Sequence, residues 1–412
     1  DIEITTSHVI RGDTRIFFSG RIVPGTADAP EWAVSLRAEH PQFGSSDVPE
    51  QPHMLDEVDV RARFDPNARL LSIDRLFAKS GKAVAQGVAT LELTPQGPYL
   101  AIAAEGERIP VAVAKQLWPI TLVPPARRWV NERIKGGFIE TVSYTGAIRP
   151  PAFDHRDPDP GWSGNDMRVD MTFSGGAVTP VGDVPEVGGL AGTLTIADET
   201  LTVTATDGTA TALSGDAVKI PEAVFQILNL PERHGKIAKV SARMEGAAPD
   251  LGTVVNSAPF KVLDRAGLKA DGVEGAGSLV VDASFPLGGQ IDLEDLDWRA
   301  TGELTDFSDR NPIMGHTVRD ADVTLQADRT QVAITGKGIL DGLKADIDLI
   351  VPLGGSGVAA RQDVVVSVTA EQLKEKGIDL TAFLDGPMTL AVARTGEEQE
   401  FVIDLESTDV HL

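Results

Sequence analysis

The sequence of 412 residues contains no cysteine, which excludes thiol catalysis, disulfides, cysteine-ligated zinc and iron–sulfur clusters. Basic side chains are scarce as well: 37 Lys and Arg stand against 61 Asp and Glu, for a formal charge of −24. This balance argues against a general nucleic-acid binder, because nothing offsets the repulsion of phosphates. It also argues against adhesion to anionic lipid headgroups through a basic face.

Long apolar runs are missing too. No stretch of about 18 apolar residues occurs, so we expect no transmembrane helix within this sequence. The sequence begins at Asp1 with neither a start methionine nor a signal-like segment. We therefore expect a processed or excised region whose membrane anchor, if it has one, lies elsewhere.

What the sequence does contain is short segments in which Val, Ile, Leu and Phe alternate with polar residues, punctuated by 41 glycines and 26 prolines. A period of two predicts strands with one apolar face and one wet face, and their close spacing predicts antiparallel all-β structure. The apolar positions of the clearest segments are Val169, Met171, Phe173, Leu194, Ile196, Leu201, Val203, Val323, Leu325, Val332, Ile334, Ile347, Leu349, Val364, Val366, Val368, Leu390 and Val392.

Length limits the architectures that so many strands can form. At roughly one strand per 15 residues the sequence holds about 25 strands, whereas open twisted sheets rarely exceed about 10. The choices are several small sandwiches, a solenoid or propeller, or one long curled sheet. We expect the last, an all-β fold with a few short helices whose long curled antiparallel sheet forms an apolar groove.

Internal similarity supports a repeating organisation. The pattern Gly137-x-Ile139-x-x-Val142-Ser143 recurs at Gly235-x-Ile237-x-x-Val240-Ser241. No linker divides the sequence convincingly. We therefore expect residues 1–412 to form one continuous β-groove region of a larger protein. Its repeat units run approximately over 110–205 and 206–355, and 356–412 supply terminal strands and a short helix.

Short helices are predicted at four places. Pro125 and Gly136 bracket an apolar stripe over 125–134, and Pro221 and Pro231 bracket a second one. Further helices are expected over 255–265 and 371–376. The last has a capping box, Thr369-x-x-Gln372.

From Leu117-Trp118-Pro119 through Pro125-x-Arg127-x-Trp129-Val130 to Gly136-Gly137-x-Ile139, the sequence resembles the AsmA-like proteins. The likeness is to the YhdP type, related to TamB among the bridge-like lipid transfer proteins, and it covers nearly all of 110–355. The resemblance implies a soluble periplasmic fragment of an inner-membrane-anchored protein of Gram-negative bacteria. It further implies a long β-groove that conducts phospholipids toward the outer membrane, with an outer-membrane or envelope protein as a further partner.

The apolar positions given above are accordingly our candidates for a groove that binds phospholipid acyl chains. The competing interpretation is that these faces pack only on one another, as in a structural or assembly scaffold of the cell envelope with closed β cores. A charge introduced on that face distinguishes the two: it is tolerated in an open groove and unfolds a closed core.

A possible gate is the helix that carries Trp118, Arg127, Trp129, Val130 and Ile134. The alternative for its stripe is ordinary helix-to-sheet packing. Arg127 and Arg128 either meet lipid phosphates or serve as exposed charges and partners of carboxylates.

Signals for an enzyme are weak. The seven histidines are scattered, and no nucleophile elbow, phosphate loop or dinucleotide fingerprint occurs. Asp154, His155, Asp157 and Asp159 offer ligands for a divalent cation, but a polar surface loop explains them better. The cluster around Asp292 to Asp297 suggests a glycosidase only weakly, because aromatics for sugar stacking are few. We expect no enzyme, no metal and no cofactor.

Overall fold

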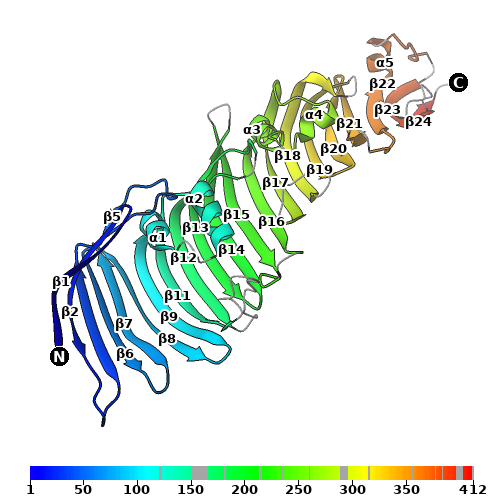
Figure 1. Cartoon of the computed structure of the whole chain (residues 1–412). Coiled ribbons are helices and arrows are strands. Elements are labelled where there is room, and N and C mark those ends of the chain that lie inside the picture. Colours follow the sequence, from blue (N-terminus) through cyan, green and yellow to red (C-terminus); the bar gives the residue numbers. More distant parts are fainter. Residues whose placement is uncertain are drawn as a thin grey trace.

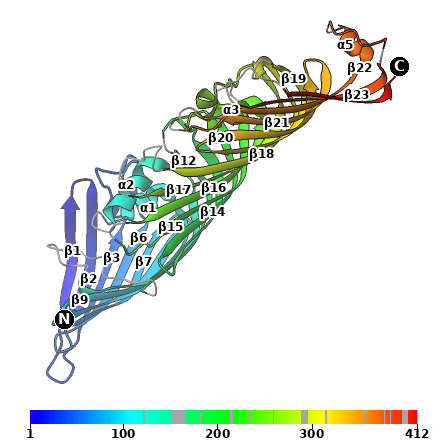
Figure 2. The same ribbon diagram turned by 90° about the vertical axis from the view of Figure 1, so that its right-hand side faces the viewer.

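The computed structural model describes residues 1–119, 123–150, 166–180, 182–212, 216–232, 235–258, 260–287, 296–313, 316–353, 356–375, 377–382, 384–395 and 402–410. The molecule is an elongated, curled sheet with the two termini at opposite ends (Figures 1 and 2). A few short helices lie along it, and the colours of Figure 1 run in order from one end to the other. The chain therefore advances along the long axis one strand at a time.

The described residues form 24 strands in a single sheet. The strands are β1 (Ile2–Arg11), β2 (Thr14–Val23), β3 (Trp32–Glu39), β4 (Gln42–Phe43), β5 (His53–Met54), β6 (Glu57–Asp65), β7 (Leu70–Ser80), β8 (Ala83–Thr94), β9 (Gly97–Pro110), β10 (Ile134–Lys135), β11 (Phe138–Ile148), β12 (Met167–Val178), β13 (Val187–Ala197), β14 (Thr200–Thr211), β15 (Ala217–Leu228), β16 (Ile237–Ala247), β17 (Val273–Pro286), β18 (Asp297–Ile313), β19 (His316–Asp328), β20 (Gln331–Leu340), β21 (Leu343–Pro352), β22 (Arg361–Thr369), β23 (Leu384–Thr395) and β24 (Val402–Val410). The helices are α1 (Val111–Leu117), α2 (Pro124–Arg133), α3 (Ala248–Val255), α4 (Val262–Ala266) and α5 (Ala370–Glu375).

Sequential neighbours pair antiparallel along the whole ladder. The order of the long strands is β1, β2, β3, β6, β7, β8, β9, and then β11 through β24 in turn. The short strands β4 and β5 extend from β2, and β10 pairs with β12. At about 4.8 Å per strand, this ladder is about 100 Å long. The expectation of one long curled antiparallel sheet is thus confirmed, and sandwiches and propellers are excluded.

Three of the four predicted helices are present in some form. Helix α2 starts at Pro124, one residue before the predicted Pro125, and α5 carries the predicted capping box. There, Thr369 N–H donates to Gln372 Oε1 at 2.9 Å, and Gln372 N–H donates to Thr369 Oγ1 at 3.3 Å. The single helix expected over 255–265 is wrong in its bounds, because two shorter helices, α3 and α4, occupy this part of the chain. None of the described helices is long and apolar enough to cross a membrane.

The helix expected between Pro221 and Pro231 is wrong. Pro221 to Leu228 belong to β15, which pairs with β14 and β16. Pro221 is tolerated because the pairing with β16 shifts register between Lys219 and Glu222, so the ring sits where the ladder is already interrupted. Pairing of β15 with strands on both sides outweighs the helical spacing of its apolar residues.

The two copies of the repeated pattern occupy equivalent places. Gly137 precedes β11 and Gly235 precedes β16, with φ angles of 80° and 79°. Both glycines therefore adopt a left-handed conformation that a side chain would disfavour. The segments before them differ, however: α2 and the short β10 precede the first copy, whereas β15 precedes the second.

Candidate functional site

One face of the sheet is apolar from strand to strand. Residues that pair directly across an antiparallel ladder point to the same side, so the register gives the composition of each face. The pairing links one row from β1 to β17 that consists of Ile4, Gly20, Leu36, Val60, Leu76, Gly87, Ala104, Tyr144, Val169, Ile196, Leu201, Ile227, Ala238 and Phe285. No charged residue interrupts it. We call this side of the sheet the groove face.

The sequence-predicted groove residues all lie on this face. On β12, Val169 and Met171 pair with Ile196 and Leu194 of β13. The candidates from Val323 onward lie on the same face, because the pairing through β15 to β18 connects β14 to β19. A second row shows this connection at the far end, and it consists of Val323, Gly336, Ile347, Val364 and Val392. Eighteen positions chosen by alternation alone thus form one surface.

Their burial differs along the molecule. Six candidates on β12 to β14 are half-buried, and Val169 is buried. Seven of those on β19 to β23 are buried, namely Val323, Val332, Ile347, Leu349, Val364, Val366 and Val368. The groove face is therefore more open toward β1 and more covered toward β24.

The groove face also includes residues of β1 to β11 that the sequence analysis did not select. Leu36, Val60 and Leu76 are examples, and Leu76 is 44% exposed. An alternating signal exists at Val58-x-Val60-x-Ala62, but small residues such as Gly87 weaken it on the neighbouring strands. A register shift between Ile73 and Leu76 also breaks the period of two.

The surroundings of Tyr144 show that the middle of the groove face is apolar. Its ring lies in the long apolar row between Ala104 and Val169. Burial raises the pKa of the Tyr144 hydroxyl, because the phenolate loses hydration there. The middle of the groove face is therefore a poor environment for charge.

The opposite face is polar and carries ion pairs between neighbouring strands. Arg63 of β6 binds Asp74 of β7 through two bonds of 2.8 Å. The Arg63 guanidinium holds the pKa of Asp74 below its usual range. Arg361 and Asp348 make a similar contact at 2.8 Å near the other end. These ion pairs lie on the side away from the groove face.

A segment of the chain covers part of the groove face. We call residues 248–258 and 260–268, which include α3 and α4, the crossing segment. Leu251 and Val254 of α3 are buried against Val218 and Met244. Farther along, Phe260 and Val262 pack against a cluster that contains Trp298, Val332 and Val351. This cover explains much of the burial at the far end.

The proposed gate helix does not bury its apolar stripe. In α2 the buried side chains are Arg127 and Asn131, whereas Trp129 is 47% exposed. Packing of the Trp129 stripe against the sheet is therefore wrong as a prediction for that residue. Trp118, Val130 and Ile134 are half-buried.

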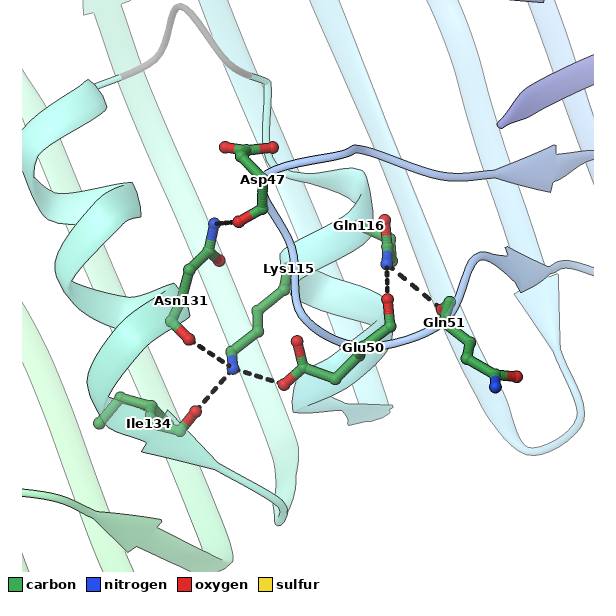
Figure 3. Close-up of polar contacts among 7 residues, drawn as sticks. All are labelled: Asp47, Glu50, Gln51, Lys115, Gln116, Asn131 and Ile134. Carbon is green, nitrogen blue, oxygen red and sulfur yellow. Dashed lines mark hydrogen bonds and ion pairs between the residues drawn. The ribbon is translucent and has the colours of Figure 1, made fainter. Parts of the chain in front are cut away.

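Instead, polar bonds latch α1 and α2 to the chain between β4 and β5, as Figure 3 shows. Lys115, only 1% exposed, donates to Glu50 Oε1 at 2.5 Å and to the carbonyl of Ile134 at 2.6 Å. Gln116 Nε2 donates to the Glu50 carbonyl at 2.8 Å, and Asn131 Nδ2 donates to the Asp47 carbonyl at 3.2 Å. We call this arrangement the polar latch.

Arg127 belongs to the same latch. Its guanidinium pairs with the carboxylate of Asp47, and Nε donates to the carbonyl of Trp118 at 3.0 Å. The sequence left two roles open for Arg127, contact with lipid phosphates or with a protein carboxylate, and the structure shows contact with the carboxylate of Asp47. Arg128 on the next position is exposed. The latch holds the two helices with hydrogen bonds, in addition to the burial of Val113 of α1 (Figures 1 and 3).

The weaker candidates for metal or catalytic chemistry fall mostly outside the described residues. This holds for Asp154, His155, Asp157, Asp159, Asp292 and most of the loop 149–166. His316 is described, and its Nδ1 lies 2.7 Å from Asp341 Oδ2. Burial opposes ionisation of Asp341, but bonds from His316 and Thr317 outweigh it and lower the pKa of this carboxyl. The pair joins the first residue of β19 to the turn between β20 and β21.

Comparison with known proteins adds no relative to this geometry: no family model, no curated protein and no solved structure matches the chain.

Proposed function

We propose that this chain is a lipid-transfer segment whose groove face shelters the acyl chains of phospholipids. The observation that carries the proposal is the uninterrupted apolar row from β1 to β17, together with its partial exposure over β1 to β14. An apolar sheet face requires a cover. Where the chain itself does not supply one, a lipid tail meets the requirement.

The energetic need for such a surface is large. A phospholipid with two tails has on the order of 30 methylenes, and each costs about 0.8 kcal/mol to expose to water. Unassisted transfer therefore costs roughly 20 kcal/mol or more. A continuous wall of Val, Ile, Leu, Ala and Gly removes most of this cost and makes few demands on tail structure, because it has no directional partner.

The acidic exterior is compatible with this role. The charge of −24 disfavours binding to headgroups by a basic surface, but it does not oppose the burial of tails. In line with the resemblance to AsmA-like proteins, we place the chain in the periplasm. There it would move phospholipid between inner and outer membranes, with attachment to the inner membrane through an anchor outside this sequence and with an envelope protein as partner.

A second candidate is a structural scaffold of the cell envelope. The burial of the groove face on β19 to β22 favours it, since Ile347 and Val364 there are already in a closed core. It accounts less well for β1 to β9, where Leu76 and Leu93 remain 44% and 48% exposed. The openness of this end favours the lipid role for that end.

Site-specific photo-crosslinking tests the proposal. A photoreactive side chain is placed at Leu36, Leu91 or Val203 on the groove face, and the protein is mixed with vesicles of phosphatidylethanolamine and phosphatidylglycerol. Matched controls carry the same group at the adjacent positions Ser35, Thr90 and Thr202, which point to the opposite face. We expect phospholipid adducts at the first set only, measured by mass spectrometry of the purified protein. Equal labelling of both sets, or none at either, contradicts the proposal.

A further inference from the structure

The crossing segment occupies the groove face where the face changes from open to closed. Its first part, α3, contacts β15, β16 and β17 (Figure 1). Leu251 and Val254 bury themselves there against groove-face residues such as Met244. The groove is therefore interrupted within the chain rather than at either end.

The second part of the segment continues the cover. Phe260, Val262 and Ala266 pack on the cluster that contains Val332 and Val351. Leu268 packs on the next cluster, which contains Val323 and Ile347. The apolar side chains of the segment thus take the place that an acyl chain would take over β17 to β21.

Hydrogen bonds and apolar contacts join α3 and α4 of the crossing segment to each other. Asn256 Nδ2 donates to Asp264 Oδ1, and the Asp264 N–H donates to Asn256 Oδ1, both at 3.0 Å. A Cβ on Gly252 would lie 3.2 Å from Leu263 Cδ1, so α3 and α4 are already in close contact. These contacts favour movement of α3 and α4 as one unit.

Two hydrogen bonds connect the segment to loops between strands. Among the described residues, the Asp183 N–H donates to the Ala258 carbonyl at 3.0 Å, and Arg265 Nη2 reaches the Arg329 carbonyl at 3.4 Å. The contacts of Leu251, Val254, Phe260 and Val262 with the sheet are apolar and have no direction. Exchange of this part of the cover for a lipid tail therefore replaces one apolar contact by another.

We propose that the crossing segment is a displaceable plug that divides the groove. Lipid enters the open part over β1 to β14, and it reaches β15 to β22 only when the segment leaves the groove face. This inference rests on the proposed function. It adds that transfer past β14 is gated by a segment of the same chain.

The first test measures the cover without lipid. Because the chain has no cysteine, Leu76→Cys and Val332→Cys each introduce a single thiol, one on the open part and one under the plug. We expect a maleimide to modify the Val332→Cys thiol at least about 10-fold more slowly, since access requires local opening. Equal rates in the folded protein overturn the inference. Circular dichroism confirms that both variants are folded.

The plug is then loosened by Phe260→Ala with Val262→Ala, both partly buried positions, and Ile378→Ala at an exposed position is the matched control. We expect the modification rate at Val332→Cys to rise about fivefold or more, with no change at Leu76→Cys. An unchanged rate at Val332→Cys contradicts a role for these two side chains in closing the groove.

Lipid labelling completes the test and separates the two proposals. With the same phosphatidylethanolamine and phosphatidylglycerol vesicles, a photoreactive group at Leu91 reports on the open part, one at Ile334 on the plugged part, and one at Thr335 on the opposite face. We expect adducts at Leu91 in both backgrounds and a several-fold gain at Ile334 only after loosening. Adducts at Ile334 that equal those at Leu91 before loosening overturn the plug alone. Absence of adducts at every position overturns the proposed function and the lipid gate with it, while the thiol rates still report whether the cover exists.

Discussion

The strands β1 to β9 and the strands β17 to β22 share one pattern but differ in what lies over it. In both regions apolar residues alternate with polar ones and point to the groove face. Leu76 in the first region is 44% exposed, whereas Ile347 in the second is 5% exposed. Each of the buried apolar clusters among the described residues lies between Val187 and Met388. Alternation therefore determines which face is apolar, and a separate element determines whether that face is a core or a surface.

The two regions also differ in how they are stabilised. The far end is held by apolar burial under the crossing segment. The near end instead has buried polar groups, Lys115, Gln116, Arg127 and Asn131, which join α1 and α2 to the chain between β4 and β5. The polar latch thus adds buried polar contacts at the end of the sheet where the groove face is more exposed.

The largest expected effect comes from a charge on each version of the groove face. Ile347→Asp places an unpaired carboxylate in a closed cluster and is expected to lower the free energy of unfolding by about 3–5 kcal/mol. Leu76→Asp places the same charge where water already reaches, and we expect a loss of less than about 1 kcal/mol. Denaturant titration followed by circular dichroism measures both. Similar losses at the two positions would show that the near end is also a closed core.

The sequence alone predicts which face of the sheet is apolar, but not where that face is covered. The period of two predicted the single sheet, its antiparallel pairing and the shared face of candidates from Val169 to Val392. It did not predict which of them are covered, because burial of Val332 depends on Phe260 and Val262, which are distant in sequence. It also missed Leu76, whose strand contains a register shift. Local patterns describe a strand, and only the packing of distant segments decides its environment.

The helices show the same limit in another way. The capping box at Thr369 was readable because cap and partner are three residues apart. The buried side of α2 could not be predicted from the sequence, because Arg127 and Asn131 bind Asp47, which lies about a fifth of the chain earlier. An apolar stripe predicts the buried side of a helix only when nothing polar competes for it. Here a polar partner does compete.

The polar latch supplies the second prediction through two adjacent arginines of α2. Arg127→Met removes a buried guanidinium together with its bonds to Asp47 and the Trp118 carbonyl, and we expect a loss of about 2–3 kcal/mol. Arg128→Met, on the exposed side, is expected to stay within about 0.5 kcal/mol. Denaturant titration gives the totals. Hydrogen exchange over 42–54 should speed up in the first variant only; unchanged exchange there would mean that the latch does not hold this segment.

A smaller effect is expected at α5, which closes the far end by packing Ala370 and Leu373 on Val368 and Met388. Thr369→Ala removes the N-cap hydroxyl that accepts the Gln372 N–H, and it should cost about 1 kcal/mol. Ser367→Ala, two residues earlier and exposed on the opposite face of β22, is the control and should be close to neutral. Equal effects in thermal unfolding would exclude a capping role for Thr369.

The smallest effect concerns the exposed ion pairs, which both regions carry on the face away from the groove. Arg63 depresses the pKa of Asp74, so the folded state releases this proton more readily than the unfolded state does. The contribution of the Arg63–Asp74 pair to the free energy of unfolding is therefore complete above the ordinary pKa of an aspartate. It disappears as the pH falls through the depressed pKa of Asp74.

Arg63→Gln should lower stability slightly at neutral pH. The difference from the parent protein should vanish in acid and shrink in high salt, because the pair is solvent-exposed. Arg361→Gln, which removes the partner of Asp348, tests the same contact at the far end. Thermal unfolding at pH 7 should give a similar small loss for both variants, since the two regions differ on the groove face and not on the outer one; a much larger loss at either end would show that the outer face also distinguishes them.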